Sequence, residues 1–263
     1  MIIAVSSVSD PASRRMGEYL VENYGLDRID ISTFRKANLT LKIIDASHLY
    51  SDTEEIIRSA KTSGPPEGIV FLSKHSSSAK IRSMTVHPVG NFSEALLGGL
   101  EGRLSRAFPD RMTDTLRNLK ARNTVKEMEV TFEATHHGPF TQTPAFYLEI
   151  GTTEEEWNNE AILDCVLSSL VEAKGNTYPN FVGIGGGHYA PKFTQYVMSE
   201  KVNIGHIVPK YQRDHVNDQT IRQAVEMTPN CRGLIMDFKG CNSEMRNTAR
   251  AVAADMGLEL IEI

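Results

Sequence analysis

A glycine-rich segment at residues 180–194 constrains the fold of this chain more than any other stretch. It reads NFVGIGGGHYAPKFT, so an apolar run leads into Gly185 to Gly187, followed by His188 and, three residues later, Pro191. Glycine adopts positive φ angles easily and lets other atoms approach the backbone, and proline suits the first turn of a helix. The segment therefore predicts a strand, a tight loop and a helix whose first N–H groups can bind an anion or a developing oxyanion.

Strands and helices alternate along most of the chain. Apolar runs that predict strands lie at residues 2–7, 41–46, 68–72, 144–150, 202–211, 233–238 and 258–263. Apolar residues recur at helical spacing between several of these runs, and a capping-box pattern at Thr153 and Glu156 predicts one long helix that ends near Gly175. This alternation is typical of an α/β fold with a largely parallel sheet, which we expect residues 258–263 to close.

Residues 127–135 alternate between polar and apolar side chains. A period of two predicts a strand. The short loop before residues 144–150 predicts an antiparallel hairpin, so we expect the sheet to be mixed. The strand ends at the pair His136 and His137. If the chain stays extended there, His137 lies on the same face as Glu133.

The length of 263 residues suits one large α/β domain or two small ones. We expect a single compact unit over residues 1–263; the alternative is two subdomains that meet near residue 84. No apolar run approaches the roughly 20 residues that span a bilayer. The three cysteines form no Cys-x-x-Cys pair, which fits a reducing cytoplasm. We therefore expect a cytoplasmic protein with no membrane partner.

The formal net charge of −5 argues against a protein that coats nucleic acid in general. Residues 103–126 are nevertheless rich in arginine and lysine. This stretch can face the phosphates of a specific RNA, or it can form the solvated face of a helix. The sequence leaves both interpretations open.

Four of the eight histidines are predicted at the ends of strands: His75, His136, His137 and His188. Carboxyl ends of parallel strands meet at one edge of a sheet, where such folds bind ligands. Histidine suits acid–base catalysis near neutral pH and metal binding, so these four residues beside Glu133 suffice for a hydrolytic site. Their spacing is not diagnostic of a metal, and the usual nucleophile, phosphate-loop and zinc-protease signatures are absent.

A nicotinamide cofactor and a catalytic role for His206 are not expected. The glycine loop has His188 where a dinucleotide-binding loop requires its third glycine, so we exclude a nicotinamide cofactor. His206 lies between apolar neighbours in the run 202–211, and we expect it to be a core residue.

Three motifs, in this order, carry a resemblance to a known family. They are EATHHGP at 133–139, GGGHYAP at 185–191 and IGHIVPKY at 204–211. Together they resemble the D-aminoacyl-tRNA deacylases found in archaea and, in related form, in plants, and the resemblance covers essentially the whole chain. It implies hydrolysis of the ester that joins a D-amino acid to the 3′ end of tRNA, and association with zinc. It also implies a three-layer α/β/α sandwich of the phosphorylase/peptidyl-tRNA-hydrolase type.

The resemblance and the residues together suggest a mechanism. His137 or His188 would activate water, alone or through zinc. Backbone N–H groups of Gly186, Gly187 or His188 would hold the oxyanion of the tetrahedral intermediate. Glu133 would orient a histidine or bind the metal.

Further residues are expected to bind metal or substrate. The expected metal ligands are His136 and His188. Contacts with the substrate, in particular with the tRNA end, are expected from polar residues near the strand ends: Lys74, His75, Tyr189, Lys192 and Lys210. We expect a monomer whose partner is D-aminoacyl-tRNA, with selectivity for the D-amino acid set by the shape of the pocket.

Two other functions compete with this hypothesis. A zinc peptidase or amidohydrolase would cleave peptides and ignore aminoacyl-tRNA. A non-catalytic module that binds the tRNA end through residues 103–126 would leave the ester intact and show a steep dependence on salt. The clustering of histidines argues against the second, because RNA binding alone needs lysine, arginine and aromatic residues more.

Overall fold

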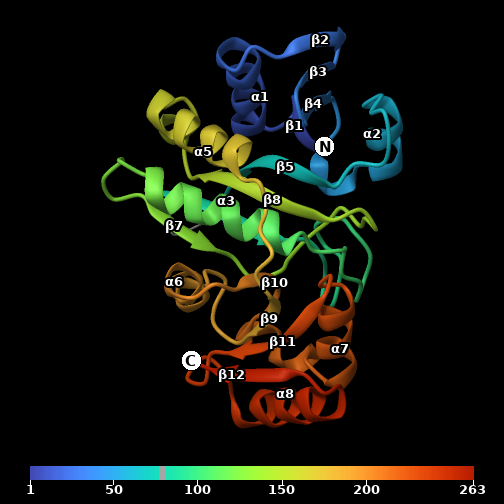
Figure 1. The fold of residues 1–263 in the computed structure, drawn as a ribbon, viewed down its shortest axis with the longest axis vertical. Helices are drawn as coiled ribbons and strands as arrows, with labels where there is room; N and C mark the ends of the chain where they lie inside the picture. Colours follow the sequence, from blue (N-terminus) through green and yellow to red (C-terminus); the bar gives the residue numbers. More distant parts are fainter. Residues whose placement is uncertain (77–80) are drawn as a thin grey trace.

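The computed structural model describes residues 1–76 and 81–263, apart from the side chain of Arg213, and within them the strands form two sheets (Figure 1). The larger has the order β2-β3-β4-β1-β5-β8-β6-β7. Its strands are β1 (Ile2–Ser7), β2 (Asp27–Asp30), β3 (Thr33–Lys36), β4 (Leu39–Ile44), β5 (Gly68–His75), β6 (Ser83–Pro88), β7 (Glu129–Phe132) and β8 (Ala145–Gly151). Parallel pairs form its centre and antiparallel pairs flank them, so the expected mixed sheet is confirmed.

The smaller sheet is parallel throughout, in the order β10-β9-β11-β12. Its strands are β9 (Asn180–Ile184), β10 (Asn203–Val208), β11 (Cys231–Met236) and β12 (Glu259–Glu262). The expectation that residues 258–263 close the same sheet as the first strands was wrong. They pair with β11 at the edge of this second sheet.

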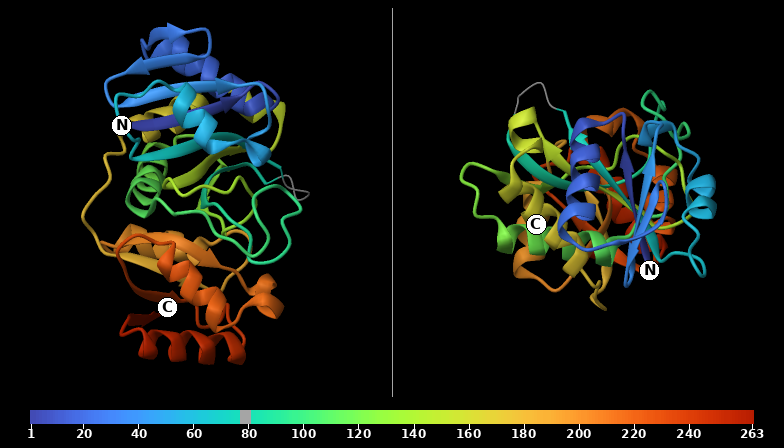
Figure 2. Two further views of the ribbon diagram at one scale, coloured as in Figure 1. Left: turned by 90° about the vertical axis from the view of Figure 1, so that its right-hand side faces the viewer. Right: turned by 90° about the horizontal axis from the view of Figure 1, so that it is seen from above.

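Helices cover both faces of the larger sheet, and successive side chains of the fully buried strand β1 point alternately to the two faces. Ile2 and Ala4 join the core beneath α1 (Pro11–Asn23), α3 (Pro109–Arg122) and α5 (Glu160–Glu172), whereas Ile3 and Val5 join the core beneath α2 (Thr53–Ser59). Figures 1 and 2 show α2 on the opposite side of the strands from α1 and α5. This arrangement is the expected α/β/α layering.

The smaller sheet is layered in the same way. Val182 and Ile184 of β9 contact the apolar faces of α7 (Asp218–Glu226) and α8 (Ser243–Asp255). Phe181 and Ile204 point to the other face and share a core with α3 and α6 (Pro191–Ser199). Because α3 contributes to the cores of both sheets, it lies between them, as Figure 1 shows.

The predicted hairpin between residues 127–135 and 144–150 was wrong. Strand β6 lies between β7 and β8, parallel to the former and antiparallel to the latter. It pairs with β8 from Ser83 opposite Gly151 to Pro88 opposite Phe146, which leaves no free edge of β8 for β7.

The predicted long helix is two helices. The capping box of Thr153 and Glu156 is present, but it opens only the short α4 (Glu154–Trp157). Asn159 then caps α5 by accepting hydrogen bonds from the N–H groups of Ala161 and Ile162, which starts a new helix. None of the helices in the described residues is both long and apolar enough to cross a membrane.

Residues 133–136 join the two sheets after β7 ends. The N–H of Ala134 donates to the carbonyl of His188 at 2.8 Å, and that of Thr135 donates to the carbonyl of Ile207 at 3.0 Å. The glycine loop is therefore held beside the end of β7. His137 has a φ of 41°, so the chain leaves the extended geometry there and His137 does not continue the alternation that contains Glu133.

His206 is a fully buried residue of β10, as expected. Its Nε2 lies 2.9 Å from the carbonyl of Ser105 and its Nδ1 lies 3.1 Å from the hydroxyl of Thr135. The carbonyl only accepts, so Nε2 carries the hydrogen and Nδ1 accepts from the hydroxyl. The neutral ring thus uses both of its nitrogens.

The basic stretch at 103–126 is largely occupied with contacts inside the protein. Arg117 donates to the carbonyls of Val197 and Val202, and Lys120 donates to that of Val130. Arg111 likewise donates to a backbone carbonyl after α5. These side chains fasten α3 to its neighbours, which weakens the interpretation of the stretch as a phosphate-binding face.

Candidate active site

The predicted strand-end histidines meet in one cavity of about 480 Å³. It opens at the carboxyl ends of β1, β5 and β8, the edge at which such sheets bind ligands. We call it the histidine cavity, and its lining residues are Ser9, Asp10, Ser47, His48, Leu49, Ser73, Lys74, His75, Ser76, Leu97, His136, His137, Tyr147, Glu149 and His188. Residues 77–80, which follow this cavity-lining segment in the chain, lie outside the described residues.

Glu133 is a fully buried carboxylate among these histidines. Nδ1 of His75 lies 3.0 Å from its Oε1, and Nε2 of His188 and of His136 lie 3.1 and 3.7 Å from its Oε2. Burial opposes ionisation, but His188 and His75 hold the pKa of Glu133 well below its ordinary value. Within the described residues neither oxygen accepts a well-aligned hydrogen bond. A buried carboxylate without such hydrogen bonds is unfavourable unless a further cation or hydrogen-bond donor contacts it.

A second buried carboxylate, Glu149 of β8, contacts two histidines. Its Oε2 lies 3.3 Å from Nδ1 of His75, and its Oε1 lies 3.7 Å from Nε2 of His87. Burial favours the neutral ring of His75, but Glu133 and Glu149 raise its pKa to about 11. His75 is therefore a cation at neutral pH, and its Nε2 lies 2.8 Å from the hydroxyl of Tyr189.

His87, His136 and His137 form a cluster in which each Nδ1 lies 2.8 to 3.0 Å from a backbone carbonyl. A carbonyl can only accept, so each Nδ1 carries hydrogen, and each Nε2 offers a lone pair when the ring is neutral. Burial lowers the pKa of His137 to about 4 and that of His136 well below its ordinary value, whereas Glu149 outweighs burial and raises that of His87. One ligand atom from each ring lies within 4.8 Å of the others. Rings fixed through Nδ1 in this way are typical of metal ligands.

The glycine loop places backbone N–H groups beside His188, at the edge of the histidine cavity. Gly185 and Gly186 have φ angles of 102° and 81°, which other residues rarely adopt. The N–H of Gly186 donates to the carbonyl of Gly240 at 3.2 Å. In the described part of the chain, the N–H groups of Gly187 and His188 donate no hydrogen bond, so they remain available to a ligand.

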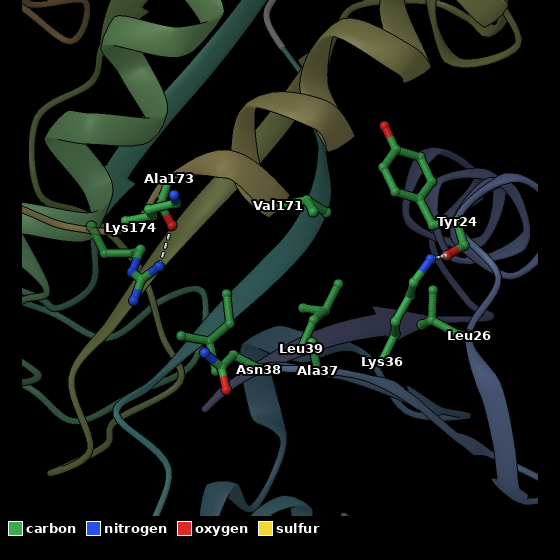
Figure 3. Close-up of a pocket in the computed structure, with 11 residues that line it drawn as sticks. Tyr24, Leu26, Lys36, Ala37, Asn38, Leu39, Val171, Ala173 and Lys174 are labelled. Atoms are coloured by element: carbon green, nitrogen blue, oxygen red, sulfur yellow. Dashed lines mark hydrogen bonds between the residues drawn. The ribbon is translucent and has the colours of Figure 1, made fainter.

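Another cavity, of about 500 Å³, opens at the opposite end of the larger sheet (Figure 3). Aliphatic side chains such as Leu26 and Leu39 line it, with Lys36 and Lys174 among them. Its lining contains no histidine and no carboxylate. Because hydrolysis needs groups that move protons or activate water, we place the chemistry in the histidine cavity.

Comparison with known proteins agrees with the motifs. The family model described as D-aminoacyl-tRNA deacylase matches residues 62–261. The chain belongs to the D-aminoacyl-tRNA deacylase family. That match contains every histidine of the histidine cavity except His48, together with Glu133 and the glycine loop.

Members of the D-aminoacyl-tRNA deacylase family are similar to this chain over its full length. The proteins of that name from Thermoplasma acidophilum and Thermoplasma volcanium are 41% and 39% identical to it over 264 residues, with 100% of each chain covered. The protein of that name from Picrophilus torridus is 37% identical over 263 residues, with the same coverage. A crystal structure of a conserved protein of unknown function matches with a TM-score of 0.89 and 28% identity, covering 100% of this chain and 95% of that one.

The residues predicted to bind substrate fall into two places. Lys74 and His75 line the histidine cavity, and Tyr189 contacts it through His75. Lys192 and Lys210 line a different hollow, beside the glycine loop. The expected metal ligands are also divided, since His136 belongs to the cluster with His87 and His137, whereas His188 groups with His75 and Glu133.

Two residues of the site, His87 and Glu149, were not predicted from the sequence. Both lie inside strands, in the segments SMTVHP and AFYLEIG, and not in the loops after them. Their position inside apolar strands could have indicated a site, because a charged or titratable side chain is buried only together with polar or charged partners.

Proposed function

We propose that this protein hydrolyses the ester bond of D-aminoacyl-tRNA and releases the free D-amino acid and tRNA. Membership of the D-aminoacyl-tRNA deacylase family supports the substrate. The main support for this reaction is the buried carboxylate of Glu133, 3.1 Å from His188. Beside it lie the N–H groups of Gly187 and His188, which donate to no group of the described residues. An activated ester needs little more than a positioned base and an oxyanion site.

His188 is the residue we assign to water activation. Its side chain is 40% exposed, whereas the rings of His75 and His87 are buried. Because Nε2 lies 3.1 Å from the carboxylate of Glu133, Nδ1 is the nitrogen that can take a proton from water as the water attacks the ester carbonyl. The same proton then passes to the ribose oxygen as the ester C–O bond breaks. Glu133 stabilises the imidazolium that exists between the two steps.

The N–H groups of Gly187 and His188 are the proposed donors to the oxyanion. Gly186 already donates to Gly240 and therefore acts in shaping the loop. Preorganised backbone donors of this kind stabilise charge that develops in the transition state.

Zinc fits the residues that are present. Nε2 of His87 and both oxygens of Glu133 are buried without a hydrogen-bond partner among the described residues. We propose that His87, His136 and His137 hold the ion, and His188 stays a candidate for both the metal and the base. When bound, zinc lowers the pKa of water and polarises a carbonyl.

Contacts with the substrate are proposed for five further residues. Lys74, His75 and Tyr189 would contact the substrate in the histidine cavity, and Lys192 and Lys210 would contact the tRNA end. We likewise propose that residues 1–263 form one compact unit and that the protein acts as a monomer in the cytoplasm.

The experiment is hydrolysis of D-Tyr-tRNA and L-Tyr-tRNA by the purified protein, with and without a chelator. We expect release of D-tyrosine far faster than of L-tyrosine. A peptidase would leave both substrates intact, and a tRNA-binding module would bind them without loss of the ester.

A further inference from the structure

Beside the histidine cavity lies a second hollow, of about 620 Å³, which we call the lysine pocket. Its lining includes Gly187, Lys192, Lys210, Tyr211 and Lys239. Gly187 directly precedes His188 in the chain, and the ring of Tyr211 lies 6.5 Å from that of His188. The two hollows therefore adjoin at His188.

The lysine pocket carries positive charge that the protein does not neutralise. Lys192 donates to Asp237, whose carboxylate also accepts from the N–H of Gly240. Lys210 and Lys239 are exposed, and in the described part of the chain their ammonium groups make no hydrogen bond or ion pair. In a chain with a formal net charge of −5, two unpaired ammonium groups in one hollow point to an anionic ligand.

The pocket also offers an aromatic surface. Tyr211 is 50% exposed. Proteins that bind single-stranded nucleic acid combine such aromatic rings, on which bases stack, with basic residues that contact the phosphates. Gly187 contributes no side chain, and a Cβ added there would meet no atom closer than 3.6 Å. The floor of the pocket beside His188 is thus open.

We infer that the lysine pocket binds the 3′-terminal adenosine of tRNA, with its base stacked on Tyr211 and the preceding phosphate held by Lys210 and Lys239. The inference rests on the proposed function, because it places the ester at His188 with the nucleotide on one side and the amino acid in the histidine cavity on the other. It adds Tyr211 and Lys239 to the recognition of the substrate.

The test measures binding of uncharged RNA, so it does not depend on catalysis. Two 5′-labelled hairpins with the same stem are compared, one ending in single-stranded CCA and the other in CC. We expect the wild-type protein to bind the CCA hairpin about tenfold more tightly, given the usual strength of base stacking on an aromatic ring. Tyr211→Ala should bind both hairpins equally, and Tyr211→Phe should keep the difference.

The lysines are tested by salt dependence. Lys210→Ala and Lys239→Ala should each reduce the slope of log Kd against log salt by roughly 0.7, the value for one phosphate of a single strand. Lys174→Ala, in the cavity of Figure 3, is the matched control and should keep the wild-type Kd and slope.

Three outcomes would overturn the inference. The first is a tenfold preference for the terminal adenosine that survives Tyr211→Ala. The second is a wild-type salt slope in the variant that carries both Lys210→Ala and Lys239→Ala, and the third is binding of AMP as tight as that of the CCA hairpin. The last would identify a site for a free nucleotide. Failure to hydrolyse D-Tyr-tRNA would instead remove the proposed function, and the binding result would still be interpretable.

Discussion

Oε2 of Glu133 lies 3.1 Å from Nε2 of His188, and the two residues follow strands of different sheets. Glu133 comes directly after β7 of the larger sheet, and His188 follows β9 of the smaller one. Their contact is held by the hydrogen bond between Ala134 and His188. The site therefore exists only when both sheets are folded and joined.

Replacing Glu133 with Gln should lower kcat/KM for D-Tyr-tRNA by about 10²-fold or more. The variant keeps the shape of the side chain but removes the charge that orients His188 and stabilises its imidazolium. The control is Glu129→Gln, on the exposed side of the same strand, which should retain activity. Turnover of Glu133→Gln close to that of the wild type would exclude this role.

Replacing His188 with Ala should also cost about 10²-fold or more in deacylation if it acts as the base. Zinc content, measured on the same preparation, separates its two candidate roles. An inactive variant that keeps the metal identifies the base. An inactive variant that has lost the metal identifies a ligand, and an active variant removes His188 from the mechanism.

Chelation should abolish activity, and added zinc should restore it. His87→Ala should lower the zinc content because His87 completes the cluster with His136 and His137. The control is His215→Ala, because His215 is exposed and belongs to none of the possible metal-binding groups found among the described residues. Full activity after exhaustive chelation, with no zinc found by elemental analysis, would contradict the metal.

The free energy of unfolding should fall as the pH drops from about 6.5 to about 4, in part because of His206. Burial lowers the pKa of His206 to about 4, so the unfolded chain takes up a proton in this window that the folded chain does not. Above pH 6.5 the titration of His206 does not change stability, and below it stability is lost as the pH falls. A difference of about 2.5 pKa units corresponds to about 3 kcal/mol.

Urea unfolding at several pH values measures this effect. His206→Asn should be less stable than the wild type at pH 7 but should lose about 3 kcal/mol less between pH 7 and pH 4. Parallel stability curves for the two proteins would show that His206 already titrates normally in the fold.

The residues that meet in the histidine cavity were largely predictable because ligand-binding side chains of an α/β sheet lie at the carboxyl ends of its strands. His75, His136, His137 and His188 were placed at strand ends from local patterns alone, and the structure brings all four into the histidine cavity. Glu133 was identified beside them, and it contacts three of the four: His75, His136 and His188. Local sequence is enough here because strand ends are marked by glycine, proline and polar residues.

The arrangement of the strands was not predictable in the same way. Whether β6 or β7 pairs with β8, and whether β12 joins the first sheet or a second, depends on contacts between residues distant in the sequence. The short polar strands β2 and β3 lack the apolar alternation that marks a strand. His87 and Glu149 were not predicted for a related reason, since their partners come from other strands.

The rates of hydrolysis of D-Tyr-tRNA and of L-Tyr-tRNA decide whether this protein is a deacylase selective for the D-amino acid. The measurement follows release of labelled tyrosine from each substrate by wild-type protein and by Glu133→Gln. We predict rapid release from D-Tyr-tRNA, much slower release from L-Tyr-tRNA, and loss of the activity on D-Tyr-tRNA in the variant. Equal rates for the two substrates, or no release from D-Tyr-tRNA by the metal-loaded wild-type protein, would contradict it.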